Sequence, residues 1–322
     1  MKAMVADPAG GPENLKYSDL PTPEPQQGQA LIKVAAAGVN FIDIYFRTGL
    51  YKAPEKPIFL GNEGAGTVAA VGPGVNLPVG ARVAWAMTRG AYAEYAVVPA
   101  ANLVTIPETV SFEDAAAVML QGMTAHYLTR STFPLKPGDT CLVHAVAGGA
   151  GLLTAQLAKL AGAHVIGTTS TPEKAKLAQQ HGADDVILYT KQDFLEEVKR
   201  ITAGKGVDVV YDSVGATTFH KSLDCLRPRG MMVSFGQSSG AVGSIDPLVL
   251  SQKGSLFLTR PSLGNYISER KDLEWRASEL FGWLAAKKLS LNIYKVYPLA
   301  AAADAHRDLE GRKTSGKLLL KP

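Results

Sequence analysis

Cysteine is scarce in this chain, and so are long apolar runs. Only two cysteines occur among 322 residues, Cys141 and Cys225, and both lie in apolar patterns. Two thiols cannot form the disulfide framework of a secreted domain, so a reducing cytoplasm is the expected setting. No apolar stretch approaches the length of a membrane span, and the N-terminus lacks the form of a signal peptide. We therefore expect a cytoplasmic protein that does not enter a membrane.

Charge of one sign is also in short supply. The 33 lysines and arginines exceed the 29 acidic residues by only four, and no basic block occurs. This balance gives no support to nucleic-acid binding, although an anionic cofactor or substrate would account for the small excess. The 46% of hydrophobic residues suffices for a sizeable core, and the length permits two domains or one large one.

The chain up to about residue 120 is rich in short strands and turn residues. Turns such as Gly72-Pro73-Gly74 and Pro78-Val79-Gly80 separate four expected strands, at residues 30–36, 66–71, 82–86 and 92–98. Short strands at this spacing favour a compact β-barrel-like domain over repeated βαβ units.

From about residue 135 the rhythm changes to alternating strands and helices. Six buried strands are expected, at 140–146, 164–168, 185–189, 207–211, 231–235 and 255–259, and helices are expected at 152–161, 192–203 and 218–226. This alternation predicts an α/β fold with a doubly wound parallel sheet. The tail is expected to form a long amphipathic helix near 268–288, a helix at 299–309, and a last strand after Gly316 that returns to the N-terminal domain.

One stretch carries the clearest functional motif. The first strand of the alternating series leads into a turn with the spacing Ala145-x-x-Gly148-x-x-Gly151, then into a helix and a second strand. A strand–turn–helix–strand unit of this kind directs a helix N-terminus at the pyrophosphate of a dinucleotide. Alanine occupies the first glycine position, and a tight turn that binds no phosphate is the alternative.

The end of the second strand indicates which dinucleotide would bind. NAD sites usually carry Asp or Glu there to hold the ribose 2′-hydroxyl. This chain instead has Ser170 and Thr171, followed by Pro172 and Lys174. Hydroxyls and a lysine in the first helical turn suit the 2′-phosphate of NADP. NADP is therefore favoured over NAD, and a solvated helix lysine is the alternative interpretation of Lys174.

Several further motifs occur along the chain. They are Ala37-Gly38-Val39-Asn40-Phe41-Ile42-Asp43 with its continuation to Tyr51, Gly61-Asn62-Glu63-Gly64-Ala65-Gly66, Gln121-Gly122-Met123-Thr124-Ala125-His126, Ser234-Phe235-Gly236, Thr259-Arg260-Pro261 and Gly316-Lys317. With them the chain resembles, over essentially its full length, the medium-chain dehydrogenase/reductase superfamily. Within it, the chain is similar to the zinc-free, NADPH-dependent quinone oxidoreductases related to zeta-crystallin. One departure is Ala150, where the turn usually has valine.

The resemblance implies a GroES-like, β-rich catalytic domain at 1–123, a Rossmann domain that binds NADP at 124–260, and a C-terminal segment at 261–322 that returns to the catalytic domain. It also implies that no metal is bound. Zinc alcohol dehydrogenases of the superfamily use Cys and His where this chain has Asn40 and Asn62. A neutral amide is a poor zinc ligand, and the four cysteines of the structural zinc lobe have no counterpart.

The same resemblance implies which residues form the site. Asn40, Tyr45 and Arg47 are the expected catalytic residues, because an amide or a phenol can donate to a carbonyl oxygen and a guanidinium can neutralise an oxyanion or a phosphate. A barrel aromatic and a surface ion pair are the alternative interpretations of Tyr45 and Arg47. The residues expected to bind NADPH are Asn40, Tyr45, Thr124, Gly148, Gly149, Ala150, Gly151, Ser170, Lys174, Tyr189, Phe235, Gln237, Ser238, Arg260 and Lys317.

The absence of zinc ligands also narrows the expected reaction. Without a Lewis acid, a plain ketone is hard to polarise, whereas a conjugated acceptor takes hydride directly from a nicotinamide. The expected function is NADPH-dependent quinone reduction. NADPH-dependent enone or alkenal reduction is one alternative, and a non-catalytic crystallin-like or RNA-binding protein that binds NADPH is another. We expect a small quinone or conjugated carbonyl as substrate, no nucleic acid, and a homodimer formed through the apolar strand at 255–259.

Overall fold

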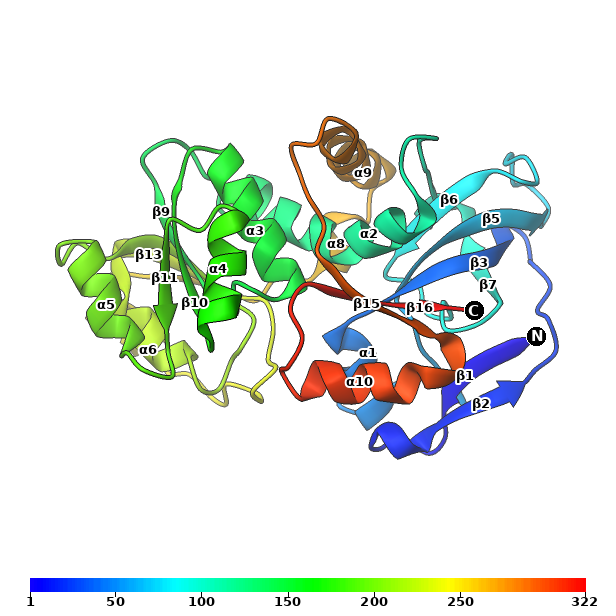
Figure 1. The fold of residues 1–322 in the computed structure, drawn as a ribbon, viewed down its shortest axis with the longest axis horizontal. Coiled ribbons are helices and arrows are strands. Elements are labelled where there is room, and N and C mark those ends of the chain that lie inside the picture. The colour runs from blue at the N-terminus through cyan, green and yellow to red at the C-terminus, as the bar shows by residue number, and fades with distance from the viewer. The chain divides into compact units, whose positions relative to one another are not determined.

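The computed structural model describes residues 1–322 and divides into two compact units (Figure 1). The first unit comprises residues 1–123 and 266–322, and the second comprises residues 124–265. The boundary between Met123 and Thr124 falls inside one helix, α2 (Phe112–Tyr127). None of the helices combines the length and the apolar character that a membrane span requires.

Unit 1 is built on a seven-stranded sheet. Its strands follow the order β15-β16-β3-β5-β6-β8, and β7 pairs with β3. Ile32, Trp85 and Leu320 are fully buried and belong to the core that these strands supply. A separate three-stranded sheet has the order β2-β1-β4. The strands are β1 (Lys2–Ala6), β2 (Leu15–Asp19), β3 (Gln29–Val39), β4 (Ile58–Phe59), β5 (Glu63–Val71), β6 (Arg82–Ala86), β7 (Tyr95–Pro99), β8 (Val104–Thr105), β15 (Ile293–Pro298) and β16 (Lys317–Lys321).

The C-terminal segment completes this sheet. β16 runs antiparallel to β3, with Leu319 opposite Gly38, and parallel to β15. Its leucines are buried, and Leu318 and Leu320 belong to the core of unit 1. The predicted return of the last strand to the N-terminal domain is therefore confirmed. Helices α8 (Leu263–Tyr266), α9 (Arg270–Ala285) and α10 (Ala302–Glu310) belong to the same part of the chain.

Unit 2 contains a six-stranded sheet in which every pairing is parallel. The order is β11-β10-β9-β12-β13-β14, with helices on the connections (Figure 1). The predicted α/β fold with a doubly wound parallel sheet is confirmed. The elements are β9 (Thr140–Val143), α3 (Gly149–Leu160), β10 (His164–Thr169), α4 (Pro172–Gln180), β11 (Asp185–Leu188), α5 (Phe194–Ile201), β12 (Val207–Asp212), α6 (Phe219–Asp224), β13 (Leu226–Ser234), α7 (Leu248–Gln252) and β14 (Phe257–Thr259).

The structure corrects several predicted boundaries. β9 ends at Val143 rather than at residue 146, because Ala145 turns the chain with a φ of 51°. α3 begins at Gly149, three residues before the predicted start, so Ala150 and Gly151 belong to the first helical turn. Four α-helices were not predicted: α1 (Phe41–Thr48), α2, α7 and α8.

Candidate functional site

The predicted cofactor residues of unit 2 gather at one edge of its sheet. Because all six strands are parallel, their carboxyl ends lie at the same edge, where sheets of this kind bind ligands. Gly148 follows β9, Ser170 follows β10 and Tyr189 follows β11. Phe235 follows β13, and Arg260 follows β14. The sequence motifs that seemed separate along the chain thus meet at one edge.

The turn after β9 is tight, and the segment from Ala147 to Gly151 that leads it into α3 consists only of alanine and glycine. Ala145, in the first glycine position of the motif, has the left-handed φ of 51° that glycine adopts at no steric cost. Gly148 precedes the 12-residue helix α3, and no side chain caps that helix. A Cβ on Gly151 would lie 2.4 Å from the carbonyl oxygen of Ala145, so only glycine allows helix and turn to approach so closely. Uncapped N–H groups beside such a bare backbone fit a dinucleotide pyrophosphate.

The end of β10 leads into a capped helix with an early lysine. Thr171 accepts a hydrogen bond at 3.3 Å from the backbone N–H of Lys174, and Pro172 is the first residue of α4. Ser170 and Lys174 are both half-buried, and burial lowers the pKa of the Lys174 ammonium. A partly desolvated ammonium and hydroxyls, with no carboxylate at the strand end, suit a phosphate group.

The loops after β12 and β13 are fixed by their own hydrogen bonds. The buried carboxylate of Asp212 accepts from the backbone N–H groups of Val214 at 2.7 Å and Gly215 at 3.1 Å. Arg260 donates to the carbonyl oxygen of Ser234 at 2.9 Å. These contacts support the loop that carries the predicted residues Phe235, Gln237 and Ser238, all half-buried.

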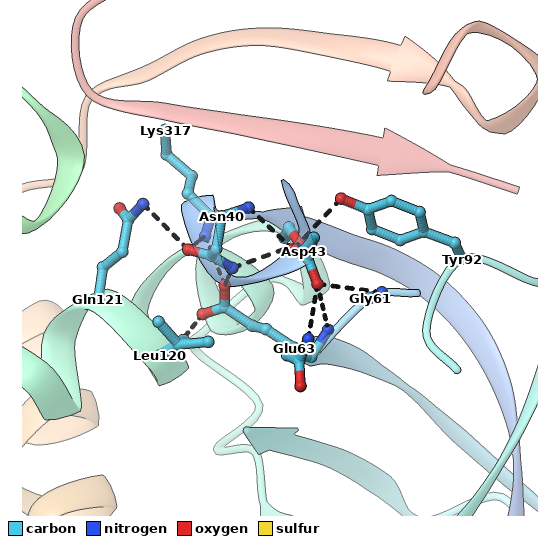
Figure 2. A network of polar contacts seen from close by, with 10 residues as sticks. Asn40, Asp43, Gly61, Glu63, Tyr92, Leu120, Gln121 and Lys317 are labelled. Carbon is cyan, nitrogen blue, oxygen red and sulfur yellow. Dashed lines mark hydrogen bonds and ion pairs between the residues drawn. The ribbon is translucent and has the colours of Figure 1, made fainter. Parts of the chain in front are cut away.

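A second group of predicted residues lies in unit 1, in a buried polar cluster formed by Asn40, Glu63, Gln121 and Lys317 (Figure 2). We call it the Asn40 cluster. The Lys317 ammonium forms an ion pair with Glu63 and donates to Oδ1 of Asn40 at 2.9 Å. Nδ2 of Asn40 donates to Glu63 at 2.8 Å, and Gln121 donates to Oδ1 of Asn40 at 3.2 Å. Lys317 and Asn40, predicted from distant motifs, are thus in direct contact.

Asp43 links this cluster to the loop before β5. Its carboxylate accepts from the backbone N–H groups of Asn40, Gly61 and Asn62, and from the Asn62 side chain at 2.8 Å. The Tyr92 hydroxyl donates to it at 3.3 Å. Complete burial raises the pKa of Asp43 to about 6, although the hydrogen bonds from Asn62 and Asn40 act in the opposite direction. Asp43 was not among the predicted site residues; the Asn-x-x-Asp spacing at the start of a helix could have indicated it.

Arg47 is buried on α1, the helix that also carries Asp43, and its side-chain hydrogen bonds are made to residues of unit 1. Its guanidinium donates two hydrogen bonds to the carboxylate of Glu310, at 2.9 and 2.7 Å, and one at 3.2 Å to Nδ1 of His306. Its Nε donates to the carbonyl oxygen of Gly10 at 3.1 Å. The alternative of a surface ion pair is wrong in one respect, because the Arg47 side chain is only 1% exposed.

Tyr45 and Thr124 occupy different surroundings. The Tyr45 ring is half-buried in an aromatic group, with its centroid 5.2 Å from that of Tyr51 and 6.3 Å from that of Phe41. Thr124 is buried in α2, 8% exposed. Both stay predicted contacts of the cofactor.

The donor set in unit 1 differs from that of a metal site. The amide nitrogens of Asn40 and Asn62 both donate to carboxylates, those of Glu63 and Asp43. No three His, Cys, Asp or Glu side chains are grouped so that they could hold a metal ion. The histidines His126 and His144 are buried singly, and His144 lies between the hydroxyls of Thr168 and Ser222.

Comparison with known proteins agrees with this arrangement. Residues 26–108 match the family model described as alcohol dehydrogenase GroES-like domain, and residues 149–275 match the one described as zinc-binding dehydrogenase. A quinone oxidoreductase of Pseudomonas aeruginosa is 48% identical over 97% of both chains. A 2-haloacrylate reductase of a Burkholderia species is 43% identical over 99% of this chain and 98% of that protein.

A solved structure extends the likeness to three dimensions. The Escherichia coli quinone oxidoreductase complexed with NADPH superposes with a TM-score of 0.98, at 44% identity, over 100% of both chains. An identity above 40% over the whole length leaves no part of the fold outside the match. The chain therefore belongs to the quinone oxidoreductases of the medium-chain dehydrogenase/reductase superfamily, the family that its motifs predicted.

Proposed function

We propose that this protein is an enzyme that transfers reducing equivalents from NADPH to quinones without a metal ion. The observation that carries the proposal is the end of β10, which has Ser170, Thr171 and Lys174 in place of a carboxylate. Hydroxyls and an ammonium at this place select the 2′-phosphate that distinguishes NADPH from NADH. The likeness to quinone oxidoreductases, one of them solved with NADPH, supports both the cofactor and the substrate class.

The predicted cofactor contacts come from both units. In unit 2, the first turn of α3 from Gly149 to Gly151, preceded by Gly148, would bind the pyrophosphate, and Ser170, Lys174 and Tyr189 would bind the adenosine end. Phe235, Gln237, Ser238 and Arg260 would line the remaining carboxyl edge. Asn40, Tyr45 and Lys317 of unit 1, together with Thr124, the first residue of unit 2, would contact the nicotinamide end of the cofactor.

NADPH held by these residues would supply the hydride. The chain's own residues then orient the acceptor, exclude water and stabilise the charge that develops on its oxygen. The Tyr45 hydroxyl can donate a hydrogen bond to the oxygen of the acceptor. Four of the five N–H donors of Arg47 bind Glu310, His306 and Gly10, so Arg47 contributes by fixing α1, the helix that carries Tyr45 and begins after Asn40.

Zinc independence is supported by the donor set. Where zinc-dependent relatives use thiolate and imidazole, this chain has two amides whose nitrogens face carboxylates. A conjugated acceptor needs no Lewis acid, because its π-system spreads the charge that hydride transfer creates.

A second candidate function is the reduction of an activated alkene. The 43% identity to a 2-haloacrylate reductase over nearly the whole chain favours it specifically. Such a substrate is a conjugated carbonyl compound, so the same unassisted hydride transfer would serve.

The proposal extends to the setting of the enzyme. Two free, buried cysteines support a reducing cytoplasm. β14 lies at the edge of the unit 2 sheet with Phe257 58% exposed, which supports a homodimer formed by edge pairing. The small net charge supports a small-molecule substrate rather than nucleic acid.

A steady-state assay tests the function. Purified protein is given NADPH or NADH together with a simple quinone, an α,β-unsaturated ketone or 2-chloroacrylate, before and after treatment with a zinc chelator. We expect kcat/KM to be highest for NADPH with the quinone and unchanged by the chelator. The absence of turnover with every quinone would set quinone reduction aside. Purified protein that holds stoichiometric zinc, and loses its activity when the chelator removes that zinc, would overturn the metal-free mechanism.

A further inference from the structure

Two side-chain amides of the Asn40 cluster differ in their hydrogen bonding: every site of the Asn40 amide is occupied, whereas the Gln121 amide has a free acceptor. Oδ1 of Asn40 accepts from both Lys317 and Gln121. Nδ2 of Asn40 donates to Glu63 at 2.8 Å and, over a longer 3.4 Å, to the carbonyl oxygen of Gly38. An amide has two acceptor and two donor sites, so Asn40 has none left for a ligand.

Gln121 is the member of the cluster with unused capacity. One N–H of its amide donates to Asn40. Its oxygen Oε1 is buried and accepts no hydrogen bond. A buried acceptor without a partner is rare in native proteins and frequently marks a functional group. The position at which a ligand can form a hydrogen bond is therefore the Gln121 amide.

The orientation of the Gln121 amide is determined, through Asn40, by the charged residues Lys317 and Glu63 (Figure 2). The Lys317 ammonium can only donate, so the oxygen of Asn40 must face it and the nitrogen of Asn40 must face Glu63. That oxygen in turn requires the nitrogen of Gln121, which turns Oε1 of Gln121 away from the cluster. A Cβ on Gly38 would come within 2.7 Å of the Lys317 ammonium, so the backbone also leaves space for the pair.

We propose that Gln121 binds the ligand of this enzyme: its Oε1 accepts a hydrogen bond from an N–H or O–H donor of the bound cofactor or product, and Lys317 and Glu63 position it through Asn40. The inference deepens the proposed function and depends on it. Two ligands of the reaction carry such a donor, namely the carboxamide of the nicotinamide ring and the hydroxyl of a hydroquinone. Thr124 follows three residues later in α2 and lies on the same face of the helix as Gln121. Because Thr124 is a predicted contact of the nicotinamide end of the cofactor, its position favours the carboxamide as the donor.

The test compares NADPH with its reduced acetylpyridine analogue, in which a methyl ketone replaces the carboxamide and removes its N–H groups. Dissociation constants of both are measured for the wild type, Gln121→Met and the control Gln27→Met, an exposed glutamine of unit 1. The wild type and the control are expected to prefer NADPH by roughly 2- to 12-fold, the range of one neutral hydrogen bond. In Gln121→Met this preference disappears because NADPH alone binds more weakly.

Further measurements identify the donor and the positioning residues. If Gln121→Met keeps the preference but weakens product inhibition by hydroquinone, the hydroxyl is the donor and Gln121 still binds the ligand. If neither measurement changes, Oε1 meets only water and the proposal is overturned. The double variant Glu63→Gln/Lys317→Met removes both charges without burying either alone, and it should lose the preference too; an unchanged preference would exclude the positioning role. Failure of the wild type to bind NADPH would instead reject the proposed function.

Discussion

Lys174 is the residue on which the choice of cofactor depends. Its backbone N–H is used by the Thr171 cap, and its side chain is half-buried at the start of α4. Burial lowers the pKa of the ammonium, and a phosphate beside it would favour the charged form again. Lys174 therefore suits an anionic ligand better than the role of a solvated helix lysine, which was the alternative interpretation of the sequence.

Replacing Lys174 by alanine should weaken NADPH far more than NADH. A charge-assisted contact of this kind contributes roughly 1 to 3 kcal/mol, and NADH lacks the phosphate that makes it. Dissociation constants for both nucleotides check this, with Lys176→Ala, an exposed lysine of the same helix, as the control. An equal loss for both nucleotides would mean that Lys174 does not recognise the phosphate.

At the scale of elements, the contact between α3 and the turn after β9 requires glycine. In Gly151→Ala the new Cβ would lie 2.4 Å from the Ala145 oxygen and 2.8 Å from two backbone atoms of Val146. Backbone cannot yield as a side chain can, so the start of α3 must shift. We expect a loss of about 1 to 3 kcal/mol in the free energy of unfolding and at least about tenfold weaker NADPH binding.

The matched control for this variant is Gly282→Ala in α9. Nothing lies within 4 Å of a Cβ there, and alanine in a helix interior is favoured over glycine by about 1 kcal/mol. Urea unfolding and NADPH titration of both variants check the contrast. Wild-type NADPH affinity in Gly151→Ala would show that the close approach of α3 is not needed for the cofactor.

A second link between elements joins α10 to the rest of unit 1 through His306. Arg47 donates to Nδ1, so Nδ1 must be unprotonated, and Nε2 is left to donate to the Tyr92 hydroxyl at 3.2 Å. Burial and the nearby Arg47 charge lower the pKa of His306 to about 3. The imidazole therefore stays neutral in the folded chain at pH values where it would be charged in the unfolded chain.

The stabilisation that follows from this pKa is present above pH 6.5, the value of an ordinary histidine, and is lost as the pH falls towards 3. Between pH 7 and pH 5 the wild type should lose roughly 2 kcal/mol more free energy of unfolding than His306→Gln. Asp43 acts in the opposite direction, since its raised pKa destabilises the fold as the pH rises towards 6, but it is present in both proteins and cancels. Urea unfolding at both pH values is the measurement, with the exposed His220→Gln as control. A constant difference between wild type and variant would contradict the neutral, buried imidazole.

The elements also explain which parts of the fold could be predicted. β9 and β12 are mostly apolar segments between turn residues, and such segments are typical of parallel strands buried on both faces. α2 was missed because Ala115 to Met119 are all fully buried, which removes the amphipathic period of a helix. The Lys317–Glu63 pair joins residues 254 positions apart, and no local pattern marks two charged residues as buried partners. The residues at the carboxyl edge of the unit 2 sheet could be predicted because local motifs mark them, whereas the contacts of the Asn40 cluster arise only from tertiary packing.

At the scale of the whole molecule, the unit 2 sheet ends in a short, open strand. β14 pairs only with β13, and Phe257 and Leu248 are 58% and 56% exposed. An apolar edge of this kind is the surface through which a second copy can continue the sheet. Light scattering of the wild type should give a mass twice the 34.1 kDa of one chain.

If β14 joins two copies as proposed, Phe257→Lys should give a monomer, because a lysine on an edge strand is poorly tolerated opposite its own symmetry mate. Val79→Lys is the matched control, since Val79 is 67% exposed but lies in a unit 1 turn away from any sheet edge. The control should keep the mass of two chains. A wild type with the mass of one chain, or a Phe257→Lys variant that stays dimeric, would show that the β14 edge does not join two copies. Because unit 2 contains the whole carboxyl edge that would bind NADPH, the monomeric variant should still bind the cofactor.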